Sequence, residues 1–207
     1  MKNESQMKYL YDPLRGFLPQ ERAGIVSPND IAFQKMDPFL RVLLVTDGTV
    51  TKFLEAYLWE PISVERCLQE EVFLKHDEPL LGLKKGESVI LRRILLRGVK
   101  TGKAYTFAES LIRIQFLESS IQKDLLEGRL GIGELLRDRR LETYREILEF
   151  GKEKAGEELA LYLQIKSNEP VYYRRYRISI NGLPVILITE KFFEGHFRLQ
   201  EKIGMER

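Results

Sequence analysis

The sequence predicts an α+β fold, a single domain with an antiparallel sheet of about six strands flanked by helices. Two observations indicate paired strands. Asn181-Gly182, the strongest short-range hairpin signal, separates the β-rich runs Val171–Ile180 and Val185–Phe193. A second pair of runs, Val89–Val99 and Tyr105–Phe116, flanks a glycine-containing turn. Segments with helical periodicity lie between these pairs, and this alternation of strand pairs with helices favours the α+β class.

The N-terminal part of the chain is expected to be irregular and then helical. Proline and glycine punctuate residues 1–37. The apolar run Pro38–Val45 is either a short buried helix or a strand, because periodicity does not decide between them. Thr49 is placed to cap a helix over Val50–Leu58, whose apolar residues recur at helical spacing until Pro61 prevents further extension.

The middle of the chain supplies strands. A strand is expected from Ile62 onward, where apolar and polar residues alternate, and Leu80–Glu87 reads as a turn. Val89–Val99 has apolar side chains on both faces, so we place it centrally in the sheet and covered on both sides. Tyr105–Phe116 is its expected antiparallel partner.

The segments before the last hairpin are mostly predicted as helices. They are a helix over Leu117–Leu130, a short helix from Gly131-Ile132-Gly133 to Leu136, an ambiguous segment over Leu141–Phe150, a helix over Glu153–Gln164 and a loop over Lys166–Pro170.

Composition excludes several classes of protein. The 207 residues include 33 basic and 31 acidic ones, a balance that argues against nucleic-acid binding by bulk charge. One cysteine, Cys67, and two histidines, His76 and His196, give little support to a disulfide framework, a zinc site or a serine–histidine triad, and we assign them no role. There is no secretory signal and no apolar run of membrane-spanning length, so the sequence predicts a reduced, cytoplasmic protein.

Glu190 is the most informative single residue. In the last predicted strand it shares a face with Ile186, Ile188 and Phe192. A carboxylate within an apolar stripe is desolvated, which raises its pKa and suits it to proton transfer. The alternative is a buried salt bridge, because structural ion pairs occupy the same surroundings.

The hairpin predicts the neighbours of Glu190. A two-residue turn at Asn181-Gly182 sets Tyr173 opposite Glu190 and makes Arg175 its diagonal neighbour. We therefore expect Arg175 to lie within pairing distance of Glu190, unless a bulge shifts the register.

Arg92 and Arg93 are the second set of candidate residues. They are adjacent in an otherwise apolar strand, so they point to opposite faces. A guanidinium fixed in a strand suits bidentate binding of a carboxylate. The alternative is that one arginine pairs with an acidic side chain of the protein and the other extends past the sheet edge.

Three further motifs are weaker. The turn Thr46-Asp47-Gly48-Thr49 resembles an anion-binding helix start, but helix capping explains it more simply. Gly131-Ile132-Gly133 lacks the full dinucleotide-binding pattern. Arg174, Arg175 and Arg177 alternate with tyrosines as in some single-strand nucleic-acid sheets, although a solvated sheet face fits the neutral charge better.

Taken in order, three segments resemble the chorismate lyase (chorismate pyruvate-lyase) family in its archaeal and cyanobacterial branch. They are Leu43–Thr51 followed by Leu54-Glu55, Leu91–Leu96, and Asn181–Pro184 followed by Ile188-Thr189-Glu190. The resemblance spans about residues 38–197, and we take residues 38–207 as one chorismate lyase-like domain.

Residues 133–197 are also similar to UTRA, the effector-binding domain of GntR-type transcription regulators, which resembles chorismate lyase in fold. A regulator of that type would carry a winged helix-turn-helix before this domain. Residues 1–85 show no such pattern and contain the Thr46–Thr49 segment instead, which favours the lyase.

The resemblance implies roles for individual residues. Arg92 matches the family's arginine that holds the ring carboxylate, and Glu190 matches its carboxylate near the ring hydroxyl. Val50 and Ile132 match pocket-lining positions, and we add Thr49 to the substrate-binding set. Two features depart from the bacterial pattern, namely Arg93 in place of an acid and a hairpin one residue longer before Glu190.

The implied activity is the elimination of pyruvate from chorismate to give 4-hydroxybenzoate. Aromatisation drives it, so the resemblance implies neither metal nor cofactor, and a small-molecule substrate as the partner rather than nucleic acid or a membrane. The alternatives are a UTRA-like module that binds a small ligand without turnover and, third, a structural or RNA-associated module.

Overall fold

The structure is a computed structural model that describes residues 35–127 and 131–197. Residues 1–34 of the predicted irregular segment therefore lie outside the described residues, as do residues 128–130 at the end of the helix predicted over Leu117–Leu130. The described part contains one sheet of six antiparallel strands in the order β1-β2-β3-β6-β5-β4. The predicted α+β class is confirmed.

Consecutive strands form two groups of three that meet where β3 pairs with β6. The strands are β1 (Ile62–Phe73), β2 (Ser88–Gly98), β3 (Ala104–Ile112), β4 (Thr143–Lys154), β5 (Pro170–Ile180) and β6 (Leu183–Phe192). The run Val89–Val99, predicted to be a central strand, corresponds to β2. This strand is interior and lies next to the edge strand β1, because β3 and β6 occupy the middle of the sheet.

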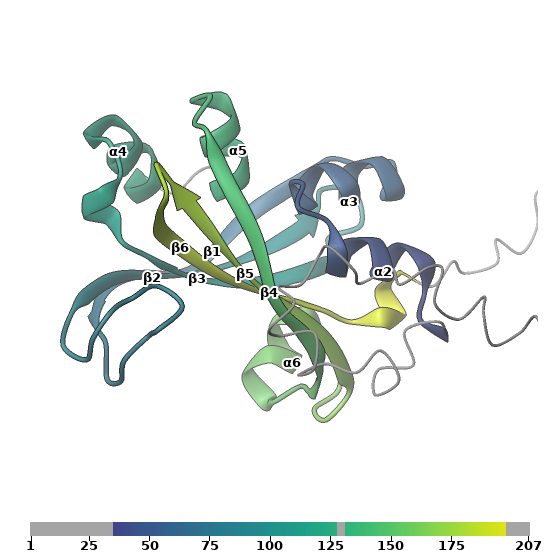
Figure 1. The fold of residues 1–207 in the computed structure, drawn as a ribbon. Coiled ribbons are helices and arrows are strands. Elements are labelled where there is room, and N and C mark those ends of the chain that lie inside the picture. The colour runs from purple at the N-terminus through teal and green to yellow at the C-terminus, as the bar shows by residue number, and fades with distance from the viewer. Residues whose placement is uncertain (1–34, 128–130, 198–207) are drawn as a thin grey trace, which may run out of the picture.

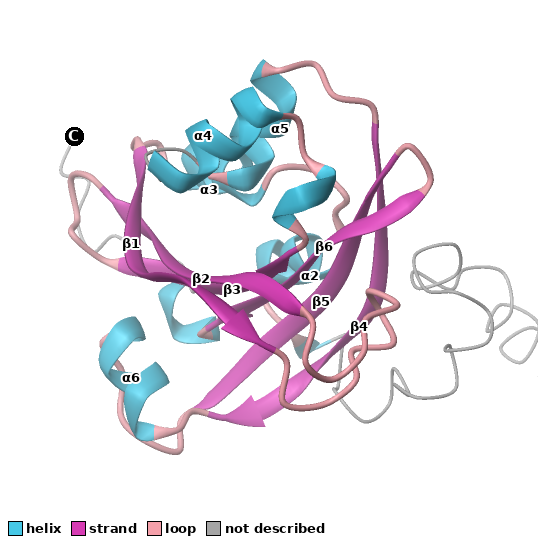
Figure 2. Ribbon diagram, turned by 90° about the vertical axis from the view of Figure 1, so that its left-hand side faces the viewer, coloured by secondary structure: helices cyan, strands magenta, loops and turns pink. Residues whose placement is uncertain are grey.

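Helices cover the two faces of the sheet unequally. The α-helices of the described residues are α2 (Pro38–Val45), α3 (Val50–Leu58), α4 (Ser119–Glu127), α5 (Ile132–Asp138) and α6 (Glu157–Leu163). Figures 1 and 2 show α3, α4 and α5 together on one face, here called the inner face, and α6 on the opposite, outer face. None of these helices is long and apolar enough to cross a membrane.

The larger hydrophobic core lies between the inner face and its helices. Leu40, Leu43 and Leu44 of α2 are fully buried in it together with Leu54 of α3 and Phe192 of β6. Helix α6 covers a second, smaller core on the outer face with Leu163. Burial of apolar side chains on both faces explains why strands such as β2 lack a strict alternation of apolar and polar residues.

The undecided segments are settled by local contacts and by burial. Pro38–Val45 is a helix because Asp37 accepts hydrogen bonds from the amides of Phe39 and Leu40, and Pro38 occupies the first turn. The ambiguous Leu141–Phe150 segment belongs to strand β4, which buries Ile147 and Phe150 on the inner face.

Two predicted boundaries are wrong. The helix expected over Glu153–Gln164 begins at Glu157, because Glu153 and Lys154 still pair with β5. The strand expected over Tyr105–Phe116 ends at Ile112 and is followed by a 3₁₀ turn over Ile114–Phe116.

The predicted hairpin turn is confirmed, but the register that it implied is wrong. Asn181 and Gly182 both have positive φ, 50° and 77°, as a two-residue hairpin of this type requires. Ile180 then pairs with Leu183 as expected, but the register shifts by one residue at Pro184 and Val185. Proline has no amide hydrogen for the ladder, and a bulge is where a strand tolerates it. Beyond the bulge, Glu190 lies opposite Arg174 instead of Tyr173.

Candidate functional site

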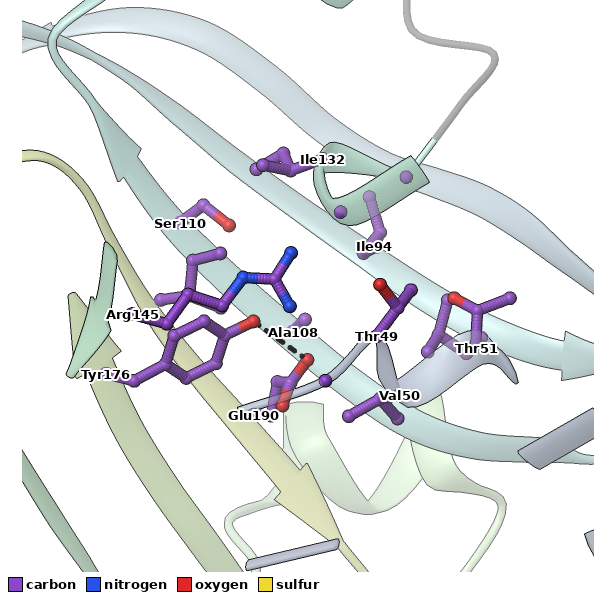
Figure 3. Close-up of a pocket in the computed structure, with 15 residues that line it drawn as sticks. Thr49, Val50, Thr51, Ile94, Ala108, Ser110, Ile132, Arg145, Tyr176 and Glu190 are labelled. Carbon is purple, nitrogen blue, oxygen red and sulfur yellow. Dashed lines mark hydrogen bonds between the residues drawn. The ribbon is translucent and has the colours of Figure 1, made fainter. Parts of the chain in front are cut away.

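A pocket lies on the inner face between the sheet, the start of α3 and the start of α5 (Figure 3). Strands β2, β3, β6, β5 and β4 form one wall, and the segments 48–51 and 131–133 form the other. Its lining residues are Gly48, Thr49, Val50, Thr51, Ile94, Leu96, Ala108, Ser110, Gly131, Ile132, Gly133, Arg145, Tyr176, Ile188 and Glu190. Six of these residues have apolar side chains, six have polar or charged ones and three are glycines. The polar groups determine which ligand the pocket binds and how it is oriented.

The register of the sheet explains which side chains meet in the pocket. Ile94, Ala108 and Glu190 lie side by side on three adjacent strands, and Arg174 continues this row on β5. Ala108 is small, which leaves open space above the sheet beside the Glu190 carboxylate. The next row along the strands contains Ser110, Ile188 and Tyr176.

Glu190 is buried, with 6% of its surface exposed, and its carboxylate has two partners. Arg174 donates from Nε to Oε2 at 2.6 Å, and the Tyr176 hydroxyl donates to Oε1 at 3.3 Å. Burial raises the pKa of the Tyr176 phenol, and the nearby Glu190 charge raises it further. Tyr176 therefore remains a neutral donor, and the negative charge of Glu190 is balanced by Arg174.

The expected partner of Glu190 was wrong by one residue. Arg175 points to the outer face, where its Nη2 lies 2.8 Å from Glu78. The bulge at Pro184–Val185 moves Arg174 into the position opposite Glu190. The interpretation of the arginine–tyrosine run as a solvated sheet face is also wrong, because Arg174 is 1% exposed and Tyr172 and Tyr176 are buried in the inner core.

The turn Thr46-Asp47-Gly48-Thr49 forms the rim of the pocket. Its carbonyls accept hydrogen bonds from two arginines: Arg174 donates to the Thr46 oxygen and Arg145 to the Asp47 oxygen. Thr49 is at the N-cap position of α3, but its side chain makes no capping hydrogen bond, so the predicted capping role is wrong. The first amides of α3 are therefore left uncapped by Thr49 at the wall of the pocket.

Arg145 is a functional candidate that the sequence analysis missed. It lies on β4, lines the pocket and extends over it toward Ser110 and Thr49 (Figure 3). Its Nη1 donates to the Asp47 carbonyl at 2.9 Å. The segment around it was ambiguous between helix and strand, so its facing could not be assigned. The alternation of Thr143, Arg145 and Ile147 was the available signal for a shared strand face.

Arg92 and Arg93 point to opposite faces, as predicted. Arg93 is on the outer face, where it pairs with Glu109 at 2.7 Å and with Glu158 at 3.2 Å. Arg92 is 1% exposed on the inner face and lies opposite Ser110. Burial, together with the charge of Arg66, lowers the pKa of Arg92 to about 10, so it stays positive near neutral pH.

The structure brings together Glu190, Thr49, Val50 and Ile132 of the predicted site residues. Arg92 stands one row away, behind Ser110, and does not contribute to the pocket wall that the described residues form. Within residues 35–127 and 131–197, no group of three or more histidine, cysteine or acidic side chains is arranged to hold a metal ion.

A second hollow lies on the outer face, lined among others by Tyr173, Arg175 and Lys191. Its cations already have acidic partners: Lys191 contacts Glu153 at 2.6 Å, and Arg175 contacts Glu78. The inner pocket, which combines a buried carboxylate with a pocket-facing arginine, is the stronger candidate for a ligand site.

A known protein family matches most of this chain. The profile of the family described as "Chorismate pyruvate-lyase Rv2949c-like" matches residues 44–198. The chain belongs to this family. A protein of Mycobacterium leprae named chorismate pyruvate-lyase is 34% identical over 174 residues, which cover 84% of this chain and 83% of that protein. A protein of Mycobacterium tuberculosis with the same name is 29% identical, covering 82% and 87%.

Solved structures include proteins that share the fold of this chain. PhnF from Mycobacterium smegmatis superposes with a TM-score of 0.59 at 11% identity, over 73% of this chain and 66% of that one. The separate effector domain of PhnF gives a TM-score of 0.57 at 12% identity and is covered to 90%. These similarities show the fold alone, and they confirm the predicted likeness of the lyase and UTRA folds.

Proposed function

We propose that this chain is a chorismate pyruvate-lyase, which converts chorismate to 4-hydroxybenzoate and pyruvate. One observation carries the proposal: in a member of this family, the buried carboxylate of Glu190 lines a pocket between the sheet and the starts of two helices, together with apolar residues and hydrogen-bond donors. The names of the mycobacterial relatives support the same activity.

Two charged groups of the inner face, Arg92 and Glu190, fit the two ends of the substrate ring. Arg92 on β2 and Glu190 on β6 are separated by strand β3 and by one row along the strands, so their backbones are about 12 Å apart. We place the ring carboxylate toward Arg92 and Ser110 and the ring hydroxyl toward Glu190. Val50, Ile132 and Thr49 then contact the ring from the helical side of the pocket.

The elimination needs one proton acceptor and a site that tolerates a departing anion. Glu190 takes the proton from the ring carbon that bears the hydroxyl, and the ether bond on the neighbouring carbon breaks with its electron pair on the enolpyruvyl oxygen. Returning that proton to the enolpyruvate gives pyruvate, so the carboxyl ends as it began. The ring becomes aromatic, which drives the reaction, and the chain's task is to orient the dianion and exclude water.

Arg174 and Tyr176 position the proposed base. The Arg174 guanidinium fixes one carboxylate oxygen, and the Tyr176 hydroxyl contacts the other. Because both groups are buried, the carboxylate is held in one orientation toward the pocket. We therefore treat Arg174 and Tyr176 as positioning residues.

The alternative function is that of a UTRA-like module that binds an aromatic or carboxylate ligand without turnover, which the fold of the PhnF effector domain favours. The two functions are separated by incubating the protein with chorismate and measuring release of pyruvate and 4-hydroxybenzoate. Saturable binding of 4-hydroxybenzoate without pyruvate release would support the sensor and reject the lyase.

Glu190→Gln tests the proposed base. Glutamine keeps the size of the side chain and most of its hydrogen bonding but removes the titrating group. We expect turnover to fall by about 10²–10⁴, the usual contribution of a general acid or base. Calorimetric binding of 4-hydroxybenzoate should persist, because Arg92 still holds the ring carboxylate. Near-normal turnover in this variant would leave Glu190 as a structural buried acid.

A further inference from the structure

We propose that Arg145 binds the second carboxylate of the substrate, the one on the enolpyruvyl group, and so distinguishes the dicarboxylate substrate from the monocarboxylate product. This inference rests on the proposed function, because it assigns a further binding residue to the same pocket. It predicts that Arg145 contributes to the binding of chorismate and not to that of 4-hydroxybenzoate.

Arg145 is a cation that faces the pocket and forms no ion pair with a carboxylate of the described residues. The nearby Arg174 and Arg177 have acidic partners, Glu190 and Glu146. By contrast, the contact found for Arg145 in this part of the chain is a neutral one, from Nη1 to the Asp47 carbonyl. A guanidinium has five donors in a planar fork, so this bond leaves donors available for a carboxylate in the pocket.

The position of Arg145 places its charge at the reacting end of the pocket. Its positive charge acts on the Tyr176 phenol, where it opposes the rise in pKa that burial causes. The Tyr176 hydroxyl in turn contacts Glu190. Arg145 and Glu190 line the same pocket, and Figure 3 draws the Arg145 guanidinium near the Tyr176 hydroxyl that contacts Glu190.

The opposite wall is built to let the guanidinium approach. A Cβ atom on Gly133 would lie 3.3 Å from Nη2 of Arg145 and 3.2 Å from Cγ2 of Thr49. Glycine at this position therefore leaves room for Arg145 between β4 and the start of α5. The first amides of the nine-residue helix α3 line the same space, and helix N-termini favour negative charge.

This arrangement also suits the departing group. As the ether bond breaks, negative charge develops on the enolpyruvyl oxygen, and a fixed cation beside the adjacent carboxylate stabilises it without reorganisation. After the reaction the product keeps the ring carboxylate and has lost the enolpyruvyl one. The pyruvate carries the enolpyruvyl carboxylate away, and once it has left, Arg145 contributes nothing to the retention of 4-hydroxybenzoate.

Calorimetric binding to Arg145→Gln tests the inference. Both ligands are titrated into Glu190→Gln protein, in which turnover is slow, with and without Arg145→Gln. We expect chorismate to bind about 10- to 100-fold more weakly when Arg145 is replaced, the range for one charge-assisted contact. We expect the affinity for 4-hydroxybenzoate to change by no more than about twofold, which also shows that the pocket is folded. Arg145→Lys should recover part of the chorismate affinity.

Arg97→Gln in the same background is the matched control. Arg97 donates to the Gly102 carbonyl at 2.6 Å and pairs with Glu65, away from the pocket, so neither affinity should change. Three results would overturn the inference. Arg145→Gln could lose affinity for both ligands equally, or it could lose affinity for neither. The third is that the Glu190→Gln protein binds 4-hydroxybenzoate and does not bind chorismate. Arg145-dependent binding of chorismate without turnover by the unsubstituted protein would reject only the proposed function.

Discussion

Replacing Arg174 or Arg175 with methionine compares two adjacent arginines that the fold treats differently. Arg174 and Glu190 form a buried pair whose side chains are 2% and 8% exposed. Arg175 and Glu78 form a pair on the outer face whose side chains are 28% and 15% exposed. Methionine keeps much of the apolar length of arginine and removes the charge, so the two variants differ mainly in the ion that each leaves behind.

The expected cost follows from this difference in burial. Arg174→Met leaves the Glu190 carboxylate buried without its cation, and breaking a buried pair in this way costs about 3–5 kcal/mol. It also removes the bond from Arg174 to the Thr46 carbonyl, which ties the pocket rim to the sheet. Arg175→Met leaves the Glu78 carboxylate unpaired, but this carboxylate is closer to solvent than that of Glu190. For a partly exposed pair, the loss in free energy of unfolding is about 1 kcal/mol or less. We therefore expect a gap of about 2–4 kcal/mol between the variants.

Equilibrium unfolding in urea at pH 7, monitored by circular dichroism, measures both free energies of unfolding. A typical domain is stable by about 5–15 kcal/mol, so the loss in Arg174→Met is large enough to resolve. The double variant Arg174→Met/Glu190→Gln should recover part of it, because a neutral amide needs no cation. If Arg175→Met is as damaging as Arg174→Met, the register through the bulge is wrong, and with it the assignment of Arg174 as the residue that positions Glu190.

Two further predictions concern the other arginine pair and a partly buried histidine, His196. Arg92→Ala should weaken binding of 4-hydroxybenzoate by about 2–5 kcal/mol in calorimetry, the range for truncating one partner of a buried charge pair, whereas Arg93→Ala should leave it unchanged because Arg93 pairs with Glu109 on the outer face. Burial, helped by the charge of Lys103, lowers the pKa of His196 to about 4. As the pH falls, His196 is protonated in the unfolded chain before it is protonated in the folded one. The free energy of unfolding should therefore fall by up to about 3 kcal/mol as the pH drops from 6.5 toward 4. In urea titrations, His196→Gln should flatten this pH dependence.

Each of these outcomes has a result that would contradict it. Equal losses of ligand binding in Arg92→Ala and Arg93→Ala would mean that the facing of β2 is misassigned. A wild-type stability that stays constant between pH 6.5 and 4, or an unchanged slope in His196→Gln, would mean that His196 is as accessible to protons in the folded state as in the unfolded one.

Most of the fold could be predicted from short-range patterns. Val50–Leu58 is helical as its periodicity predicts, and Asn181-Gly182 forms the expected turn because both residues tolerate positive φ. The opposite facing of Arg92 and Arg93 follows from the two-residue period of a strand. These features depend on neighbours within a few residues, so the sequence specifies them directly.

The pairing of Glu190 could not be predicted by counting residues from the hairpin turn, because one extra residue interrupts the strand. Pro184 interrupts the ladder just after the turn, and the resulting shift places Arg174 opposite Glu190 in place of Tyr173. The pairing therefore depends on the position of the bulge, which the sequence alone does not give.

By itself the sequence determined the α+β class, the family resemblance and the buried face on which Glu190 lies, because periodicity and turn residues act locally. The tertiary structure decided which charges meet. Arg174 reaches Glu190 and the Thr46 carbonyl across 16 and 128 residues of sequence, and Arg145 reaches Asp47 across 98. Contacts of this separation arise from the order and register of the strands, and a shift of one residue turns each side chain to the other face of the sheet.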